Sequence, residues 1–245
     1  KCAEAGIVVF NTPGANANAV KELVLTGLLL SSRKIPQAIA WAHSLEHEEG
    51  IAKLVEKGKS QFAGPEIKGK TLGIIGLGAI GALVANAAIA LGMQVVGTDP
   101  FLSVGAALRL NPAVKIVKDS DGVFAAADYL TIHVPFNNDT KGMINAETIA
   151  KMKDGVLLIN TSRGPLIVEE DLAAALQSGK VAGAGLDVLA VEPARMDNPL
   201  LKEENCLVTP HIAWAPKESR QRLMDIAVEN LKAFLAGAPQ NVVNA

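Results

Sequence analysis

Three polar residues in the second half of the chain could together support hydride transfer. Arg163 lies in NTSRG, Glu192 in GLDVLAVEP and His211 in TPHIAW. Removing hydride from an alcohol carbon requires a base for the hydroxyl proton, and imidazole titrates near neutral pH. A carboxylate beside the imidazole orients it and favours its protonated form, and a guanidinium binds a substrate carboxylate through two parallel hydrogen bonds. Each residue alone has an ordinary structural explanation, so the interpretation depends on their joint occurrence.

A glycine motif upstream supplies the cofactor half of this chemistry. GLGAIG (76–81) follows an apolar run and opens an alanine-rich segment, which is the context that dinucleotide binding requires. Gly76 permits the tight turn, Gly78 lets a pyrophosphate approach the backbone, and Gly81 lets the helix pack on the strand. The helix N-terminus then offers free N–H groups to the phosphates. Asp99 ends the next apolar run, where its carboxylate would bind the ribose hydroxyls and repel a 2′-phosphate, so we predict NAD rather than NADP.

The elements that must position these residues alternate between strand and helix from residue 71 onward. This alternation predicts an α/β fold with a Rossmann-type, doubly wound parallel sheet. The carboxyl ends of such strands share one crevice, so Arg163, Glu192 and His211 can converge there. The expected strands are 71–76, 94–99, 129–135, 155–161, 181–188 and 206–210, and the expected helices are 80–91, 169–179 and 217–235.

The first 63 residues are harder to assign. IVVF (7–10) suggests a short strand, 17–30 an apolar helix buried between domains or subunits, and 36–60 a polar helix. The segment GPEIKGK (64–70), with two glycines and a proline, indicates a domain boundary near residue 64. We therefore expect three parts. They are a connecting segment with a helical dimerisation arm at 1–63, an NAD-binding domain at 64–216, and a C-terminal helix and tail at 217–245.

Composition excludes several functional classes. The net charge of −2 provides neither a nucleic-acid footprint nor a polybasic membrane surface, and VLTGLLL is too short to span a bilayer. Cys2 and Cys206 match no metal spacing and suggest a reduced, cytoplasmic protein. His43 and His47 are spaced i, i+4 but lack a nearby third ligand, so we expect solvated side chains and no metal. Asp119 and Asp121 suggest a helix cap.

The motifs GLGAIG, HVP, NTSRGPLIVEEDL, GAGLDVLAVEP and TPHIAW occur in the order found in the D-isomer-specific 2-hydroxyacid dehydrogenases, and the chain resembles that family over nearly its whole length. The resemblance implies that Arg163, Glu192 and His211 form the catalytic set, and Glu192 argues against formate dehydrogenases, which carry glutamine there. His133 is expected to contribute backbone beside the cofactor rather than a catalytic side chain, and Trp214 either walls the nicotinamide pocket or packs. The implied NAD contacts are Thr12, Gly76, Gly78, Ala79, Ile80, Gly81, Asp99, Val134, Pro135, Thr161, Ser162, Arg163, Asp187, His211 and Ala213.

Two departures from the family pattern leave the substrate open. Most of the family's substrate domain is absent, and the chain opens on Lys1, so we expect a fragment. Residues 1 to about 155 are most similar to 3-phosphoglycerate dehydrogenases of serine synthesis, whereas the remainder is more similar to glycerate dehydrogenases (hydroxypyruvate reductases), as in a recombined or engineered chain. We expect an NAD-dependent dehydrogenase for 3-phosphoglycerate, with glycerate as the alternative, that forms a homodimer. The competing readings are a non-enzymatic NAD-binding module, as in the related corepressors, and a cofactor-binding domain that is inactive alone.

Overall fold

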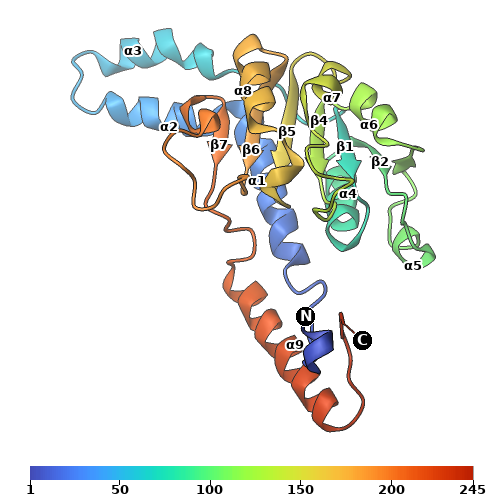
Figure 1. The fold of residues 1–245 in the computed structure, drawn as a ribbon. Coiled ribbons are helices and arrows are strands. Elements are labelled where there is room, and N and C mark those ends of the chain that lie inside the picture. The colour runs from blue at the N-terminus through green and yellow to red at the C-terminus, as the bar shows by residue number, and fades with distance from the viewer. Residues whose placement is uncertain (245) are drawn as a thin grey trace.

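A seven-stranded parallel sheet forms the centre of the computed structural model, which describes residues 1–244 (Figure 1). The strand order is β3-β2-β1-β4-β5-β6-β7, and every neighbouring pair is parallel. This arrangement confirms the predicted doubly wound sheet, whose direction of winding reverses between β1 and β4. The strands are β1 (Thr71–Ile75), β2 (Gln94–Thr98), β3 (Lys115–Ile116), β4 (Tyr129–Ile132), β5 (Val156–Asn160), β6 (Val181–Leu186) and β7 (Cys206–Val208).

Helices cover both faces of the sheet. On one face, α1 (Ala17–Arg33) packs on β5, β6 and α4 (Ala79–Ala90). The other face carries α6 (Ser120–Ala126), α7 (Ala146–Ala150) and α8 (Glu169–Ser178). Because both faces are covered, central strands such as β4 and β5 are buried at every position, which explains their continuous apolar runs. A short helix, α5 (Val104–Ala107), follows β2, and 3-10 turns occur at Ala3–Ala5, Lys59–Phe62, Gly164–Leu166 (η3) and Pro199–Lys202 (η4).

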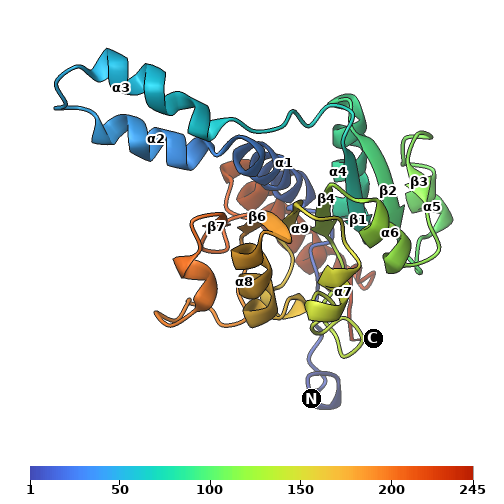
Figure 2. The same ribbon diagram turned by 90° about the horizontal axis from the view of Figure 1, so that it is seen from above.

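A helical hairpin projects away from this body (Figure 2). It consists of α2 (Ile35–Ser44) and α3 (Ile51–Gly58), so the predicted helix over 36–60 is interrupted by a turn. Helix α1 is part of the cover of the sheet, and its Val24 and Leu28 are fully buried within this chain, whereas Leu29 is 44% exposed. The expectation that 17–30 lies between domains or subunits stays a prediction for the outer face of this helix.

The two ends of the chain meet beside the last helix, α9 (Lys217–Leu235), which begins and ends as predicted. The expected strand at 7–10 is wrong. Ile7 is exposed, and Phe10 forms only an isolated antiparallel bridge with Val242, outside the main sheet. Asn230 of α9 donates to the Asn11 carbonyl at 2.9 Å and so fastens the helix to the N-terminal segment. Within residues 1–244, no helix has both the length and the hydropathy needed to cross a bilayer.

Candidate active site

Three glycines shape the turn between β1 and α4, each for a different reason. Gly76 has φ +94°, and a Cβ there would lie 2.6 Å from the His133 carbonyl oxygen. At Gly81 a Cβ would collide with the Gly76 carbonyl, whereas at Gly78 it would meet nothing within 4 Å. A side chain is therefore excluded at Gly76 and Gly81 by the chain itself, while the space above Gly78 is free for a ligand. This geometry fits the pyrophosphate of a dinucleotide at the N-terminus of α4.

Asp99 lies directly beside this turn, after β2. One carboxylate oxygen accepts from the Leu77 N–H and the other from the Phe101 N–H, each at 2.9 Å. The two backbone donors hold the carboxylate at the edge of the glycine loop. An acidic group in this place is the feature on which the prediction of NAD over NADP rests.

An open cleft lies at the carboxyl ends of β1, β4 and β5, where the sheet changes direction. Two polar atoms in it, His133 Nδ1 and Thr161 Oγ1, are buried without a hydrogen-bond partner among residues 1–244. Buried polar atoms are normally paired, so these two atoms also fit a site that takes a polar ligand. The cleft is lined by Asn16, Val20, Ile80, His133, Val134, Pro135, Phe136, Thr161, Ser162, Arg163, His211, Ala213 and Trp214.

His211 and Glu192 form a hydrogen-bonded pair at this cleft. The Nδ1 atom of His211 lies 2.7 Å from a Glu192 carboxylate oxygen, and the two side chains are 41% and 37% exposed. The other Glu192 oxygen accepts from the Leu189 N–H at 3.1 Å. Since a carboxylate only accepts hydrogen bonds, His211 carries a proton on Nδ1, and its Nε2 atom remains available for proton exchange.

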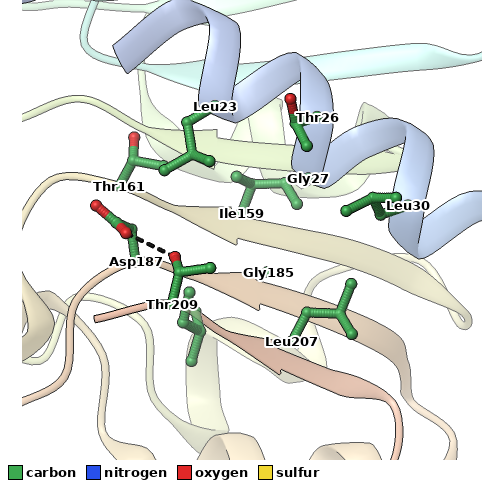
Figure 3. Close-up of a pocket in the computed structure, with 11 residues that line it drawn as sticks. Leu23, Thr26, Gly27, Leu30, Ile159, Thr161, Gly185, Asp187, Leu207 and Thr209 are labelled. Atoms are coloured by element: carbon green, nitrogen blue, oxygen red, sulfur yellow. Dashed lines mark hydrogen bonds between the residues drawn. The ribbon is translucent and has the colours of Figure 1, made fainter. Parts of the chain in front are cut away.

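Asp187 holds the turn that presents His211. Its carboxylate accepts from Thr209 Oγ1 at 2.6 Å (Figure 3). It also accepts from the N–H groups of Ile212 and Ala213, each at 2.8 Å. The Asp187 carbonyl also accepts from the His211 N–H at 2.8 Å. These bonds stabilise a left-handed backbone at His211, φ +54°, which is costly for a residue other than glycine. Asp187 therefore stabilises the histidine turn directly, while its implied contact with NAD remains a prediction.

Arg163 enters the same cleft from the loop after β5. Its guanidinium donates to the Ser162 carbonyl at 2.7 Å, and across residues 1–244 it forms no ion pair. The buried Asn160 side chain donates to the Arg163 carbonyl at 2.9 Å and accepts from the Ser162 N–H at 3.0 Å. Asn160 thus fixes the loop that presents the arginine, whose remaining N–H groups can bind an anion.

His133 follows β4, and its ring contacts Thr131 Oγ1 through Nε2 at 3.0 Å. Burial lowers the pKa of His133 to about 4, so the ring is neutral at physiological pH. This neutral state makes it a poor proton donor and is consistent with the expected minor role of its side chain.

The structure brings most of the predicted site residues to one region, although not all of them line the cleft. The glycines, Ala79 and Asp99 form the adjoining turn, and Asp187 and Glu192 lie behind His211. Thr12 is not among the lining residues, although it precedes Asn16 and Val20, which are. Sequence reasoning missed Asn16, Val20 and Phe136. The signal that could have indicated Asn16 is the turn-rich segment NTPGANAN (11–18) in which it lies.

The chain is similar to known dehydrogenases over most of its length. A family model described as "D-isomer specific 2-hydroxyacid dehydrogenase, NAD binding domain" matches residues 25–213. A hydroxypyruvate reductase from Blautia hydrogenotrophica is 52% identical over 183 residues, which are 73% of this chain and 54% of that protein. A D-3-phosphoglycerate dehydrogenase from Archaeoglobus fulgidus is 40% identical over 98% of this chain and 43% of its own length. The chain thus spans about half the length of these two curated relatives.

A solved structure shows the same fold with ligands bound. The D-lactate dehydrogenase from Aquifex aeolicus, complexed with NAD and lactic acid, superposes with a TM-score of 0.83 at 29% identity. The match covers 100% of this chain and 75% of that one. The likeness therefore extends over the whole described sheet, its helices and the projecting hairpin.

Proposed function

The chain belongs to the D-isomer-specific 2-hydroxyacid dehydrogenases as their NAD-binding domain, and from this membership we propose that it supplies the cofactor site and the acid–base pair of an NAD-dependent oxidoreductase acting on a D-2-hydroxy acid. The observation that carries the proposal is the 2.7 Å hydrogen bond between His211 and Glu192 at the cleft that Arg163 also lines. We place the protein in the cytosol, in line with its two free cysteines, Cys2 and Cys206.

The roles of the three side chains follow from their chemistry. NAD, held by the glycine turn and Asp99, would supply the acceptor for the hydride that leaves C2 of the substrate. His211 Nε2 takes the proton of the 2-hydroxyl as the carbonyl forms, and returns it in the reductive direction. Glu192 keeps the other ring nitrogen hydrogen-bonded and stabilises the charged imidazole. Arg163 binds the substrate carboxylate and so sets which face of C2 meets the nicotinamide.

Within this class we propose 3-phosphoglycerate as the substrate, with glycerate as the alternative. The first choice rests on the motifs of residues 1–155, and the Archaeoglobus fulgidus relative supports it. The alternative rests on the motifs after Val156, and the Blautia hydrogenotrophica relative supports it. The rates of NADH formation from a panel of D- and L-2-hydroxy acids distinguish 3-phosphoglycerate from glycerate as the substrate. They are measured with the longest native chain that contains these residues.

The mechanism is tested by His211→Ala and Glu192→Gln in the same protein. His211→Ala should lower kcat by about a hundredfold to ten-thousandfold, the usual contribution of a positioned acid–base group, with the NADH Kd changed by no more than about threefold. Glu192→Gln should retain part of the activity, because the glutamine side-chain oxygen can still accept from His211 Nδ1 although its charge is lost. A His211→Ala enzyme that kept most of its kcat would make the histidine a turn residue and refute the mechanism.

A further inference from the structure

The loop that carries Glu192 has little structure of its own. It connects β6 to η4, and its residues 190–197 are all exposed. Met196, within it, is 97% exposed. Such a segment has few buried contacts to hold it in one conformation, yet Glu192 must stay within hydrogen-bond distance of His211.

One carboxylate joins the two ends of this loop. Glu169, the first residue of α8, accepts from the Ala190 N–H at 2.8 Å through one oxygen. Its other oxygen accepts from the Asn198 side-chain amide at 3.0 Å. Ala190 precedes Glu192 by two positions and Asn198 follows it by six, so the carboxylate closes the loop around the residue that orients the histidine. Closing a flexible loop at its base reduces the number of conformations open to its tip.

The Asn198 end of this bridge is firmly anchored. Asn198 is buried, and its side-chain oxygen accepts from the N–H of the fully buried Leu200 at 2.9 Å. The polarity of the amide is thereby fixed, because its oxygen faces Leu200 and its NH2 group faces Glu169. A donor in place of the Glu169 oxygen would oppose another donor.

The Ala190 end is packed against the loop that presents Arg163. A Cβ on Gly164 would collide with the backbone of Leu189 and Ala190. The chain segment from Arg163 to Glu169 therefore carries both the substrate-binding guanidinium and the carboxylate that holds the Glu192 loop.

We propose that Glu169 is a positioning residue for the acid–base pair. By bridging Ala190 and Asn198 it holds the 190–198 loop in the conformation that places Glu192 against His211. The proposal rests on the proposed function for its effect on turnover, but the hydrogen bond between Glu192 and His211 that it predicts can be measured without turnover.

The ordinary explanation of an acidic residue here is its charge, since carboxylates in the first turn of a helix stabilise the helix dipole. Glu170 provides the matched control. It is the next residue of the same turn, its side chain is exposed, and among residues 1–244 it accepts no side-chain hydrogen bond. Glu170→Gln removes the same charge from the same helix end without touching the bridge.

The decisive test exchanges donor and acceptor across the bridge. Glu169→Gln places an amide NH2 against that of Asn198, and Asn198→Asp places two carboxylates together. In Glu169→Gln/Asn198→Asp the glutamine oxygen can accept from Ala190, and its NH2 group can donate to the aspartate, whose other oxygen still accepts from Leu200. We expect each single variant to lower kcat by about tenfold, since displacing a catalytic group by about 1 Å can cost up to about a hundredfold. The double variant should recover most of that loss, with the NADH Kd within about twofold throughout.

The ring nitrogens of His211, observed by 15N NMR in the present chain, provide the second readout. The parent, Glu170→Gln and the double variant should share one spectrum in which Nδ1 is hydrogen-bonded, and both single variants should lose that signature. Unchanged kcat and ring spectrum in Glu169→Gln, or a loss in it that the double variant does not recover, would overturn the proposal. If the ring signal is lost in the single variants and recovered in the double variant, but the parent protein oxidises no 2-hydroxy acid, the bridge is supported and the proposed function is refuted.

Discussion

At the scale of single residues, the site combines side chains that the chain holds in place with atoms that it leaves free. The side chains of Asp187 and Asn160 form hydrogen bonds with the backbone of the loops that carry His211 and Arg163, respectively. The N–H groups of Arg163 and the buried oxygen of Thr161 are available instead to a ligand. The residues that hold the loops in place are thus different from the residues that can bind a ligand. This division is expected of a site whose geometry is formed before the ligand binds.

Asp99 is predicted to set the choice between the two nicotinamide cofactors. NADH should bind much more tightly than NADPH, because a 2′-phosphate would meet the Asp99 carboxylate. Asp99→Asn keeps an acceptor for one of the two backbone N–H groups and removes the charge, so the ratio of the two Kd values should narrow by about tenfold, equivalent to about 1.4 kcal/mol. Fluorescence titration measures both constants. Equal constants in the unmodified protein would contradict the assignment.

His133 is predicted to weaken the fold in mild acid. Burial lowers its pKa from 6.5 to about 4, so between these values the unfolded chain binds more protons than the folded chain. Stability rises with pH under that condition, and the contribution of His133 is therefore lost as pH falls from about 6.5 toward about 4.

The check is the melting temperature as a function of pH. In His133→Gln, which can still bond to Thr131, the decline across this window should be shallower than in the parent. The exposed His43 supplies the control, since His43→Gln should follow the parent curve. Parallel curves for the parent and His133→Gln would show that the half-buried His133 ring does not titrate as stated.

At the scale of elements, the β1–α4 turn separates folding from binding in two neighbouring glycines. Gly81→Ala should lower the free energy of unfolding by about 1–3 kcal/mol, because its Cβ would collide with the Gly76 carbonyl. Gly78→Ala should melt like the parent but bind NADH about tenfold more weakly, because its Cβ enters only the space proposed for the pyrophosphate. Thermal unfolding and NADH titration of both variants provide the comparison. Normal NADH affinity in Gly78→Ala would move the phosphates elsewhere.

Among the elements that the sequence predicts, strands such as β5 are buried at each position, so a continuous apolar run marks them. In α9 the buried residues are Ser219 and Asn230, and its bounds are marked instead by Pro216 before it and by Gly237 and Pro239 after it. The two-residue β3, with both residues exposed, offers no such pattern. The segment 7–10 has the residue pattern of a strand but does not lie in the main sheet. Whether a segment joins a sheet depends on tertiary structure, which the local pattern does not show.

The site divides in the same way. The glycine turn and the Arg163, Glu192 and His211 motifs are local strings, so their residues could be named in advance. The bridge from Glu169 could not, because an acid in the first turn of a helix is common and its partners lie 21 and 29 positions further along the chain. Which backbone N–H it accepts from depends on how α8 packs beside the loop.

At the scale of the whole molecule, the α2–α3 hairpin remains the best support for the predicted homodimer. Ile39, Ile51 and Leu54 are between 37% and 53% exposed on a projection that the rest of the chain does not cover. Association of two copies would bury such residues. Sedimentation at micromolar concentration should give about twice the 25.5 kDa mass of one chain.

Ile39→Glu with Leu54→Glu should reduce that mass to one chain while the far-ultraviolet circular dichroism remains unchanged. Leu108→Glu, at an 82% exposed position away from the hairpin, should leave the dimer intact and serves as the control. A single-chain mass for the unmodified protein would count against the hairpin as a dimer-forming arm.

The pairing of the two chain ends has a consequence for the order of folding. The Val9 N–H donates to the Asn244 side chain at 2.7 Å, a contact that spans 235 positions, and the Val243 N–H donates to the Val9 carbonyl at 3.0 Å. During translation these contacts of Val9 can therefore form only after residues 243 and 244 have left the ribosome. The central sheet ends at β7 (Cys206–Val208), so all of its strands are synthesised before residues 242–244, and it can assemble in the meantime. The paired segments around Val9 and Val243 are thus the last part of the molecule to fold. Their backbone amides should become protected from hydrogen exchange only after those of the sheet.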